Sequence, residues 1–226
     1  MDLPHAGGLD PITVARALVG VEEDGTVGEA RPAVVQLRAK QADTGERIRL
    51  VRALLPVMRA AGVVLIVDDD VSAGREANGV HLGQEDMAAL AGGRSWSEVL
   101  KEVRSAGGPG FLIGLSTHTR AQVEQSAGLD VDYIGFGPIF PTRSKANPDP
   151  CVGLDALRVV CEISPHPVVA IGGIGRDEAL RCAQAGAAGA AMISALVGAT
   201  ASEVRERAAS LAVTLSRVTW GRWPRG

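Results

Sequence analysis

This sequence predicts an α/β fold of the TIM (β/α)8 barrel type that lacks its first strand. From residue 33 almost to the end, short β-branched runs alternate with longer helical stretches, and such alternation implies right-handed crossovers and a parallel sheet. The apolar residues are mainly Ala, Val, Leu and Ile with only 3% aromatics, which suits buried parallel strands covered by helices. Polar residues follow the carboxyl ends of these strands, where barrel enzymes build their active sites.

The expected strands are short apolar runs at residues 33–38, 63–69, 79–84, 111–116, 133–139, 168–173 and 189–195. The expected helices cover residues 11–19, 45–61, 96–106, 120–127, 154–162, 177–185 and 201–217. No strand precedes the first helix, and the acidic segment 21–31 is expected to be a surface excursion. The barrel is therefore one strand short, and its unpaired edge invites association into a homo-oligomer. Two explanations stay open: residues 1–8 cover part of the edge, or the natural protein starts further upstream.

Length and composition favour one domain over residues 1–226, with flexible tails at 1–10 and 218–226. A net charge of −3 and a pI near 5.8 favour neither nucleic acid nor a membrane surface as partner. No apolar run approaches a membrane span, and the N-terminus lacks the features of a secretory signal. Three cysteines without metal-ligand spacing indicate thiols in a reducing cytoplasm.

The end of the first expected strand carries a candidate anion site. With a period of two, Gln36, Arg38 and Lys40 share one face, while Leu37 and Ala39 share the other. Two cations and an amide at a strand's carboxyl end suit an anionic ligand. The alternative is a charged, solvated strand end.

Carboxylates follow the next two strands, at Asp68, Asp69 and Asp70 and at Glu85 and Asp86. Neighbouring parallel strands would bring these groups together. Hard oxygen ligands beside an anion site indicate Mg²⁺ shared with substrate phosphates. Helix N-capping by Asp70 and Asp86 explains the same residues equally well.

The segment 133–145, Y-I-G-F-G-P-I-F-P-T-R-S-K, is the most informative in the chain. Its glycines, Gly135 and Gly137, allow the backbone to approach something closely. Thr142, Ser144 and Lys145 then offer two hydroxyls and an ammonium, a set of donors that suits a phosphate. An ordinary polar loop between strand and helix is the alternative.

Three further places carry polar or glycine signals. Ser116 ends a strand and can reach a ligand, whereas His118 is more often a neighbour of a helix cap than an acid or base. His81 lies inside a strand and is expected to be a satisfied core residue. The last two strands end in Gly172-Gly173 and Ile193-Ser194, loops that commonly form the phosphate site of barrels.

Taken in order, Q-L-R-A-K, V-H-L-G-Q-E-D, G-L-S-T-H-T, G-P-I-F-P-T-R-S-K and A-I-G-G-I resemble thiamine-phosphate synthase. The resemblance implies a barrel enzyme, a transferase that joins a hydroxymethylpyrimidine diphosphate to a thiazole phosphate and releases pyrophosphate. It implies a pyrimidine-diphosphate site at Gln36, Arg38, Lys40, Asp68, Ser116 and Lys145, with Arg38, Ser116 and Lys145 assisting catalysis. It implies Mg²⁺ on Asp69 and Asp86, and a thiazole-phosphate site at Thr142, Ser144, Gly173, Ile193 and Ser194.

Three departures from the family pattern are visible. Family members usually carry Asn where this chain has Asp68, the stretch from Asp69 to Asp86 is shorter by about one or two residues, and the opening strand is absent. Asp68 either adds a ligand to Mg²⁺, which we favour because Arg38 and Lys40 keep it ionised, or repels the diphosphate. A related thiazole tautomerase with His118 as base, and a non-catalytic regulator that binds thiazole phosphate, are the alternative functions.

Overall fold

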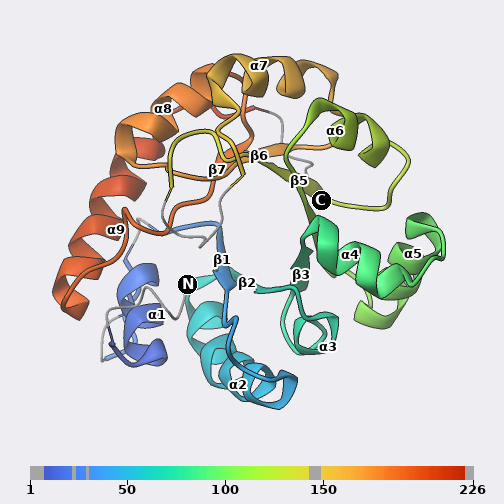
Figure 1. Cartoon of the computed structure of the whole chain (residues 1–226). Coiled ribbons are helices and arrows are strands. Elements are labelled where there is room, and N and C mark those ends of the chain that lie inside the picture. The colour runs from blue at the N-terminus through green and yellow to red at the C-terminus, as the bar shows by residue number, and fades with distance from the viewer. Residues whose placement is uncertain (1–7, 22–23, 29–30, 143–148, 222–226) are drawn as a thin grey trace. The chain divides into compact units, whose positions relative to one another are not determined.

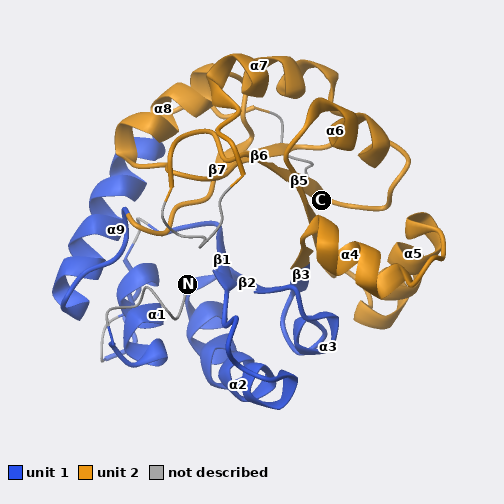
Figure 2. Cartoon of the chain, viewed as in Figure 1, with its two compact units in different colours: residues 1–80, 195–217 blue, residues 81–194, 218–226 orange. Residues whose placement is uncertain are grey.

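The computed structural model describes residues 8–21, 24–28, 31–142 and 149–221. The chain divides into two compact units, coloured separately in Figure 2. Unit 1 comprises Met1–Val80 and Ala195–Arg217, and unit 2 comprises His81–Ser194 and Val218–Gly226. The single domain expected over residues 1–226 stays a prediction.

Within the described residues the strands follow one another as β1-β2-β3-β4-β5-β6-β7 in a seven-stranded sheet (Figure 1). They are β1 Val34–Leu37, β2 Val64–Asp68, β3 Gly79–Leu82, β4 Leu112–Thr117, β5 Tyr133–Phe136, β6 Val168–Ala170 and β7 Gly189–Ala190. The pairs β1–β2, β4–β5, β5–β6 and β6–β7 are all parallel. All seven expected strands are confirmed, and the α/β barrel-type alternation with them.

Helices separate the strands. They are α1 Pro11–Val19, α2 Thr44–Ala61, α3 Val71–Gly74, α4 Gln84–Ala91, α5 Trp96–Gly107, α6 Arg120–Ser126, α7 Gly153–Ile163, α8 Arg176–Gln184 and α9 Ala201–Leu215. The sequence prediction missed α3 and α4. The first is a single turn, and the second buries only Met87 and Ala91, so neither shows a helical apolar period that a sequence window could detect. None of the helices in the described part of the chain is long and apolar enough to cross a membrane.

Unit 1 holds a continuous apolar core. Helix α2 begins after Asp43, whose carboxylate accepts a hydrogen bond from the Glu46 amide at 2.7 Å. It ends at Gly62, which adopts the left-handed conformation with φ of 64°. Its buried face contributes Leu54 and Met58, both 0% exposed, to a core with residues of α1, β1, β2 and α9. This packing fixes the positions of β1 and β2, and with them the positions of the residues at the ends of these strands.

Residues 8–10, which are the described residues before α1, contain no strand, and the absence of a first strand stays a prediction. Residues 1–7, which would have to cover the free edge, lie outside the described residues. The expected surface excursion contains an isolated antiparallel bridge between Val21 and Val27. In the C-terminal tail, Gly221 donates a hydrogen bond to the Ala187 carbonyl at 2.7 Å, so the tail is attached to unit 2 at this point.

Candidate active site

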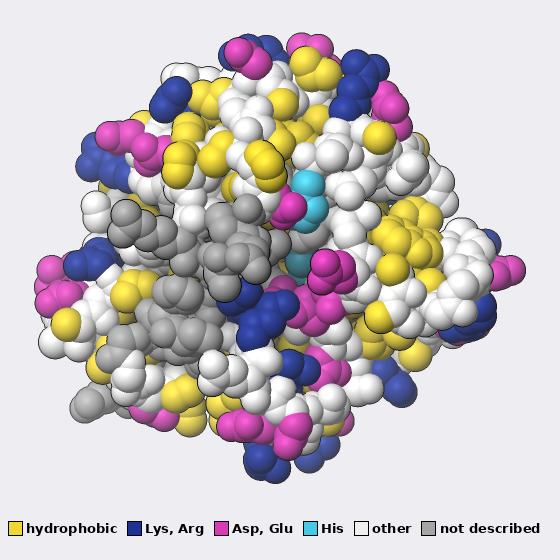
Figure 3. All heavy atoms as spheres, viewed as in Figure 1, with side chains coloured by type: hydrophobic (Ala, Val, Ile, Leu, Met, Phe, Trp, Pro, Cys, Tyr) yellow, Lys and Arg dark blue, Asp and Glu magenta, His cyan; other side chains and the backbone are white. Residues whose placement is uncertain are grey.

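The end of β1 has the alternation that the sequence predicted. Leu37 and Ala39 are buried, whereas Gln36 and Arg38 are partly exposed and Lys40 is exposed. Figure 3 shows basic side chains next to acidic ones over the ends of β1 and β2. Gln36 pairs in register with Ile66 of β2, two residues before Asp68, so both strands deliver polar side chains at the same end.

Asp68 is the centre of a charge cluster in unit 1. Its carboxylate accepts a hydrogen bond from the Gln36 amide and lies 3.3 Å from Arg38 Nε and 3.5 Å from Lys40 Nζ. The side chain is only 10% exposed, so solvent screens these contacts weakly. Gln36, Arg38 and Lys40, three of the residues expected to bind the diphosphate, therefore all contact Asp68.

Asp69 pairs with the same lysine. Lys40 Nζ donates a hydrogen bond to the Asp69 carboxylate. Burial by itself would lower the pKa of the Lys40 ammonium, but this bond and the charge of Asp68 raise it above its usual value. Asp69 has a φ of 66°, and no other residue except glycine has a positive φ in the described ranges. Such a conformation is unfavourable for a residue with a Cβ and occurs preferentially at functional sites.

Asp70 has a structural role. Its carboxylate accepts hydrogen bonds from the Ala73 amide at 3.0 Å and from the Thr44 hydroxyl at 2.8 Å, and it forms an ion pair with Arg47 at 3.1 Å. Burial by itself would raise the pKa of Asp70, but these donors hold it below its usual value. The capping explanation is confirmed for this residue.

Asp86 also contacts a helix start. It is the third residue of α4, and its carboxylate accepts a hydrogen bond from the Gly83 amide at 3.1 Å. In the described part of the chain, no group of three or more His, Cys, Asp or Glu side chains is arranged to hold a metal ion. A magnesium site on Asp69 and Asp86 therefore stays a prediction.

Ser116 lies near the end of β4 in unit 2, partly exposed. Its hydroxyl is 2.8 Å from His81 Nε2, and its carbonyl accepts a hydrogen bond from the Gln84 amide at 2.6 Å. His81 is 7% exposed and hydrogen-bonded at both ring nitrogens, as expected of a satisfied core residue. Nothing in the sequence indicated that a partner of His81 would be Ser116.

His118 is bound to the backbone. Its Nδ1 donates to the Gly137 carbonyl at 2.7 Å, because a carbonyl can only accept, and lies 3.7 Å from the Asp149 carboxylate. Its own amide donates to the Gln122 side chain at 2.6 Å, next to the Thr119 cap of α6. This placement agrees with a neighbour of a helix cap.

The glycines of the two loops after β5 and β6 face each other. A Cβ on Gly137 would lie 2.1 Å from the Ile171 carbonyl oxygen, and one on Gly173 would lie 2.4 Å from the Pro141 carbonyl oxygen. The Ile139 amide donates to the Ile171 carbonyl at 2.9 Å, and the Phe140 amide to the Gly172 carbonyl at 3.1 Å. The close approach predicted for Gly137 is thus to the neighbouring loop of the same protein.

The remaining predicted phosphate ligands are only partly described. Thr142 is half-buried after this loop, whereas Ser144 and Lys145 lie outside the described residues. The last strand, expected to reach residue 195, ends at Ala190, and Ile193 and Ser194 lie in the turn that follows. The next helix, α9, begins only at Ala201, so no helix starts directly after these two residues.

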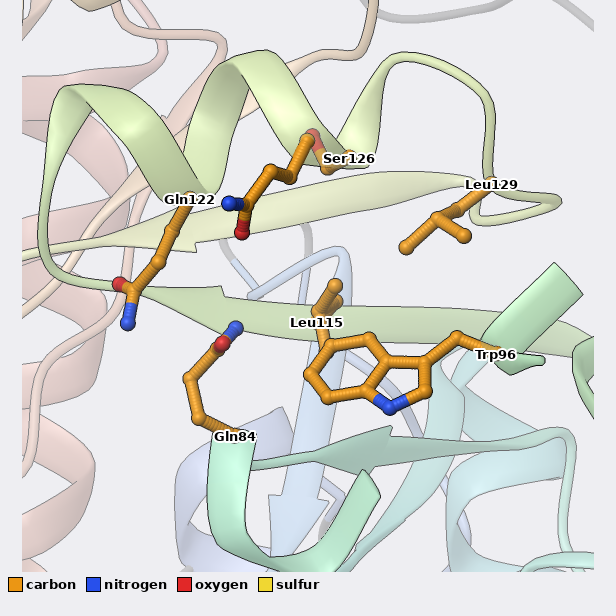
Figure 4. A pocket seen from close by; sticks show the side chains of 7 residues that line it. Gln84, Trp96, Leu115, Gln122, Ser126 and Leu129 are labelled. Atoms are coloured by element: carbon orange, nitrogen blue, oxygen red, sulfur yellow. The ribbon is translucent and has the colours of Figure 1, made fainter. Parts of the chain in front are cut away.

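A separate cavity of about 220 Å³ lies in unit 2 between α4, α5, α6 and β4 (Figure 4). Leu115 of β4, Gln84 and Trp96 line it. Leu115 and Ser116 are consecutive strand residues and point to opposite faces of the sheet. None of the predicted site residues lines this cavity.

The sequence comparisons with known proteins point to one family. The sequence model of the family "Thiamine monophosphate synthase" matches residues 15–196. The thiamine-phosphate synthase of Anaeromyxobacter dehalogenans is 37% identical over 219 residues, covering 96% of this chain and 90% of the relative. That of Methanocella arvoryzae is 42% identical over 166 residues, or 73% of each chain.

Among solved structures, a thiamine phosphate pyrophosphorylase from Pyrococcus furiosus is similar, with a TM-score of 0.66 and 29% identity over 90% of this chain and 91% of that one. The matched family region begins within α1 and includes β1 to β7. On this agreement of sequence, motif order and fold, the chain belongs to the thiamine-phosphate synthase family.

Proposed function

We propose that this protein is a transferase that condenses 4-amino-2-methyl-5-(diphosphooxymethyl)pyrimidine with a thiazole phosphate, giving thiamine phosphate and pyrophosphate. The observation that carries the proposal is the family match over residues 15–196, which includes all five motifs at the strand ends. The substrates are small molecules. We place the reaction in the cytoplasm, in keeping with three free cysteines.

The pyrimidine diphosphate is assigned to Gln36, Arg38, Lys40, Asp68, Ser116 and Lys145. The thiazole phosphate is assigned to Thr142, Ser144, Gly173, Ile193 and Ser194. These assignments rest on the motifs. The cluster of Gln36, Arg38 and Lys40 around Asp68 supports the first of them, because it gathers donors and cations that an anionic ligand can use.

In the reaction, pyrophosphate departs from an electron-rich pyrimidine methylene, and the thiazole nitrogen attacks the carbon left behind. The protein needs to neutralise charge on the leaving group and to align the two substrates. Arg38 and Lys145 suit the first task as cations, and Ser116 can donate a hydrogen bond to a diphosphate oxygen. No covalent nucleophile is required.

Mg²⁺ is proposed to be held by Asp69 and Asp86. The donor set fits, because both residues offer hard carboxylate oxygens, and the ion pair of Asp69 with the Lys40 ammonium supports a cation at this carboxylate. When bound, the ion would neutralise part of the negative charge of the diphosphate. Asp86 would then serve both the ion and the first turn of α4.

The proposal is tested by forming thiamine phosphate from the two purified phosphates at increasing Mg²⁺ concentration. Asp86→Asn keeps an oxygen acceptor for the Gly83 amide but removes the charge, so we expect it to lose at least tenfold in rate at low Mg²⁺. Glu85→Gln is the matched control, because it removes a charge from an exposed neighbour on the same turn. An equal response of both variants would refute the magnesium assignment.

The same assay separates the alternative functions. Isomerisation of the thiazole phosphate without condensation would identify a tautomerase. Binding of the thiazole phosphate without any turnover would identify a regulator. Either result would refute the proposed function.

A further inference from the structure

Three side chains of unit 2 form a continuous hydrogen-bonded chain across three strands. Tyr133 on β5 places its hydroxyl 2.8 Å from Nδ1 of His81 on β3, and Nε2 of His81 lies 2.8 Å from the hydroxyl of Ser116 on β4. The imidazole and phenol rings are 5.4 Å apart between centroids. Tyr133 and His81 are 8% and 7% exposed, so the chain runs from a buried hydroxyl to the partly exposed Ser116.

Two glycines make the space for this chain. A Cβ on Gly114 would lie 2.3 Å from Tyr133 Cζ and 2.5 Å from His81 Nδ1, so any side chain there would displace the two rings. A Cβ on Gly135 would lie 3.3 Å from His81 Cε1. Gly114 pairs in register with Tyr133, and Gly135 with Ser116. Glycine inside a strand is destabilising relative to Ala, and here two such positions accommodate one imidazole.

The direction of the hydrogen bonds decides what Ser116 can offer. A neutral imidazole has one donor and one acceptor nitrogen. If Tyr133 donates to Nδ1, the proton of the ring is on Nε2, which donates to the Ser116 oxygen and leaves the Ser116 proton for a ligand. If Nδ1 donates to Tyr133 instead, Nε2 accepts the Ser116 proton. Only the first direction lets Ser116 donate to an anionic oxygen, which has no proton to give.

We propose that Tyr133 and His81 are positioning residues that hold the Ser116 hydroxyl as a hydrogen-bond donor toward the diphosphate. The proposal rests on the assignment of Ser116 to the pyrimidine diphosphate in the proposed function. Tyr133 fixes the Nε2–H form of His81, and His81 in turn fixes the rotation of the Ser116 hydroxyl. A buried tyrosine thereby influences substrate binding without contacting the substrate.

Tyr133→Phe tests the chain with the smallest change, since it removes one hydroxyl and keeps the ring that packs over Gly114. We expect kcat/KM for the pyrimidine diphosphate to fall about five- to tenfold, while KM for the thiazole phosphate and Tm stay nearly unchanged. Thr117→Val is the matched control, because Thr117 is 0% exposed and its hydroxyl donates to the Gly135 carbonyl at 3.0 Å. It should lower Tm and leave kcat/KM for the diphosphate intact.

A double-mutant cycle distinguishes positioning from general packing. If Tyr133 acts through Ser116, then Tyr133→Phe should have almost no further effect on kcat/KM in a Ser116→Ala background. Equal effects in both backgrounds would overturn the proposal. If Ser116→Ala itself leaves kcat/KM unchanged, the assignment of Ser116 fails instead, so the two failures are distinguishable.

The tautomer of His81 provides a readout that a purely structural role would not change. In ¹⁵N-histidine spectra of the full chain, His81 should carry its proton on Nε2, with and without the pyrimidine diphosphate bound. Tyr133→Phe should shift part of the population to the Nδ1–H form. A wild-type His81 protonated on Nδ1 in the diphosphate complex would overturn the proposal.

Discussion

Two substitutions of Asp69 separate the effect of its charge from the effect of its backbone conformation. Its φ of 66° costs a residue with an ordinary Cβ about 1–2 kcal/mol, whereas Asp and Asn tolerate this region better. The ion pair with Lys40 adds little, because the lysine side chain is 43% exposed and such pairs contribute about 0.5 kcal/mol. Asp69→Ala should therefore lower the free energy of unfolding by roughly 1–2 kcal/mol, and Asp69→Asn by less than about 0.5 kcal/mol.

The two variants should behave alike in activity. For a chain of this length, about 1 kcal/mol shifts Tm by roughly 2–4 °C, so thermal unfolding resolves Asp69→Ala from Asp69→Asn. Both lose the carboxylate, and both should lose at least tenfold in thiamine phosphate formation at low Mg²⁺. The reasoning is refuted if Asp69→Asn keeps the wild-type rate and magnesium dependence, or if Asp69→Ala is as stable as the wild type.

Three further predictions follow from single residues. Asp68→Asn should weaken magnesium binding without tightening binding of the pyrimidine diphosphate, both measured by calorimetry, because we favour the Asp68 carboxylate as an additional ligand of Mg²⁺; tighter diphosphate binding with unchanged magnesium dependence would instead show that this carboxylate repels the diphosphate. Lys145→Ala should cut kcat/KM by tenfold or more, about 1.4 kcal/mol, with nearly unchanged Tm, since its ammonium is assigned to the diphosphate rather than to the fold; a large loss of Tm with intact kinetics would contradict this. The pKa of Asp70 is lowered in the folded protein, so its ionised carboxylate stabilises the fold at pH values above the unfolded pKa of about 4. This stabilisation is lost as the pH falls through the pKa that Asp70 has in the folded protein. Denaturant unfolding of Asp70→Asn should therefore show a smaller loss of stability between about pH 5 and pH 2 than the wild type.

The strands were predictable because each lies in a short apolar run bordered by a glycine or a polar residue, although β7, Gly189–Ala190, contains no β-branched residue. The end of β1 is an example: alternation along Gln36, Leu37 and Arg38 correctly predicted which side chains are buried. The helix α4 was not predictable in this way. Its eight residues bury two side chains, and the polar start at Gln84 and Asp86 resembles a strand end as much as a helix start.

The contacts between residues of the candidate site could be predicted less well from the sequence than the locations of the strands and helices. Gly137 correctly indicated close backbone approach, but a glycine does not specify whether a ligand or another loop approaches it. His81 was correctly interpreted as a core residue, yet its bond to Ser116 depends on the register of three strands. Gly114, two residues before Ser116, was the one local signal, and it became interpretable only when the His81 and Tyr133 rings were placed above it.

Asp68, Asp69 and Asp70 are chemically identical neighbours with three different environments. The left-handed turn at Asp69 and the hydrogen bond from the Asp70 amide to the Asp68 carbonyl at 2.9 Å separate the directions of the three side chains. Asp68 contacts Arg38 and Lys40, which follow β1, Asp69 contacts Lys40, and Asp70 caps α3. Deleting any one of the three would leave two consecutive Asp residues, which a sequence comparison would treat as a minor change. It would nevertheless remove the turn at Asp69, the contact of Asp68 with the two cations, or the cap on α3. Substitution scores based on residue type alone will therefore overestimate how interchangeable these three positions are.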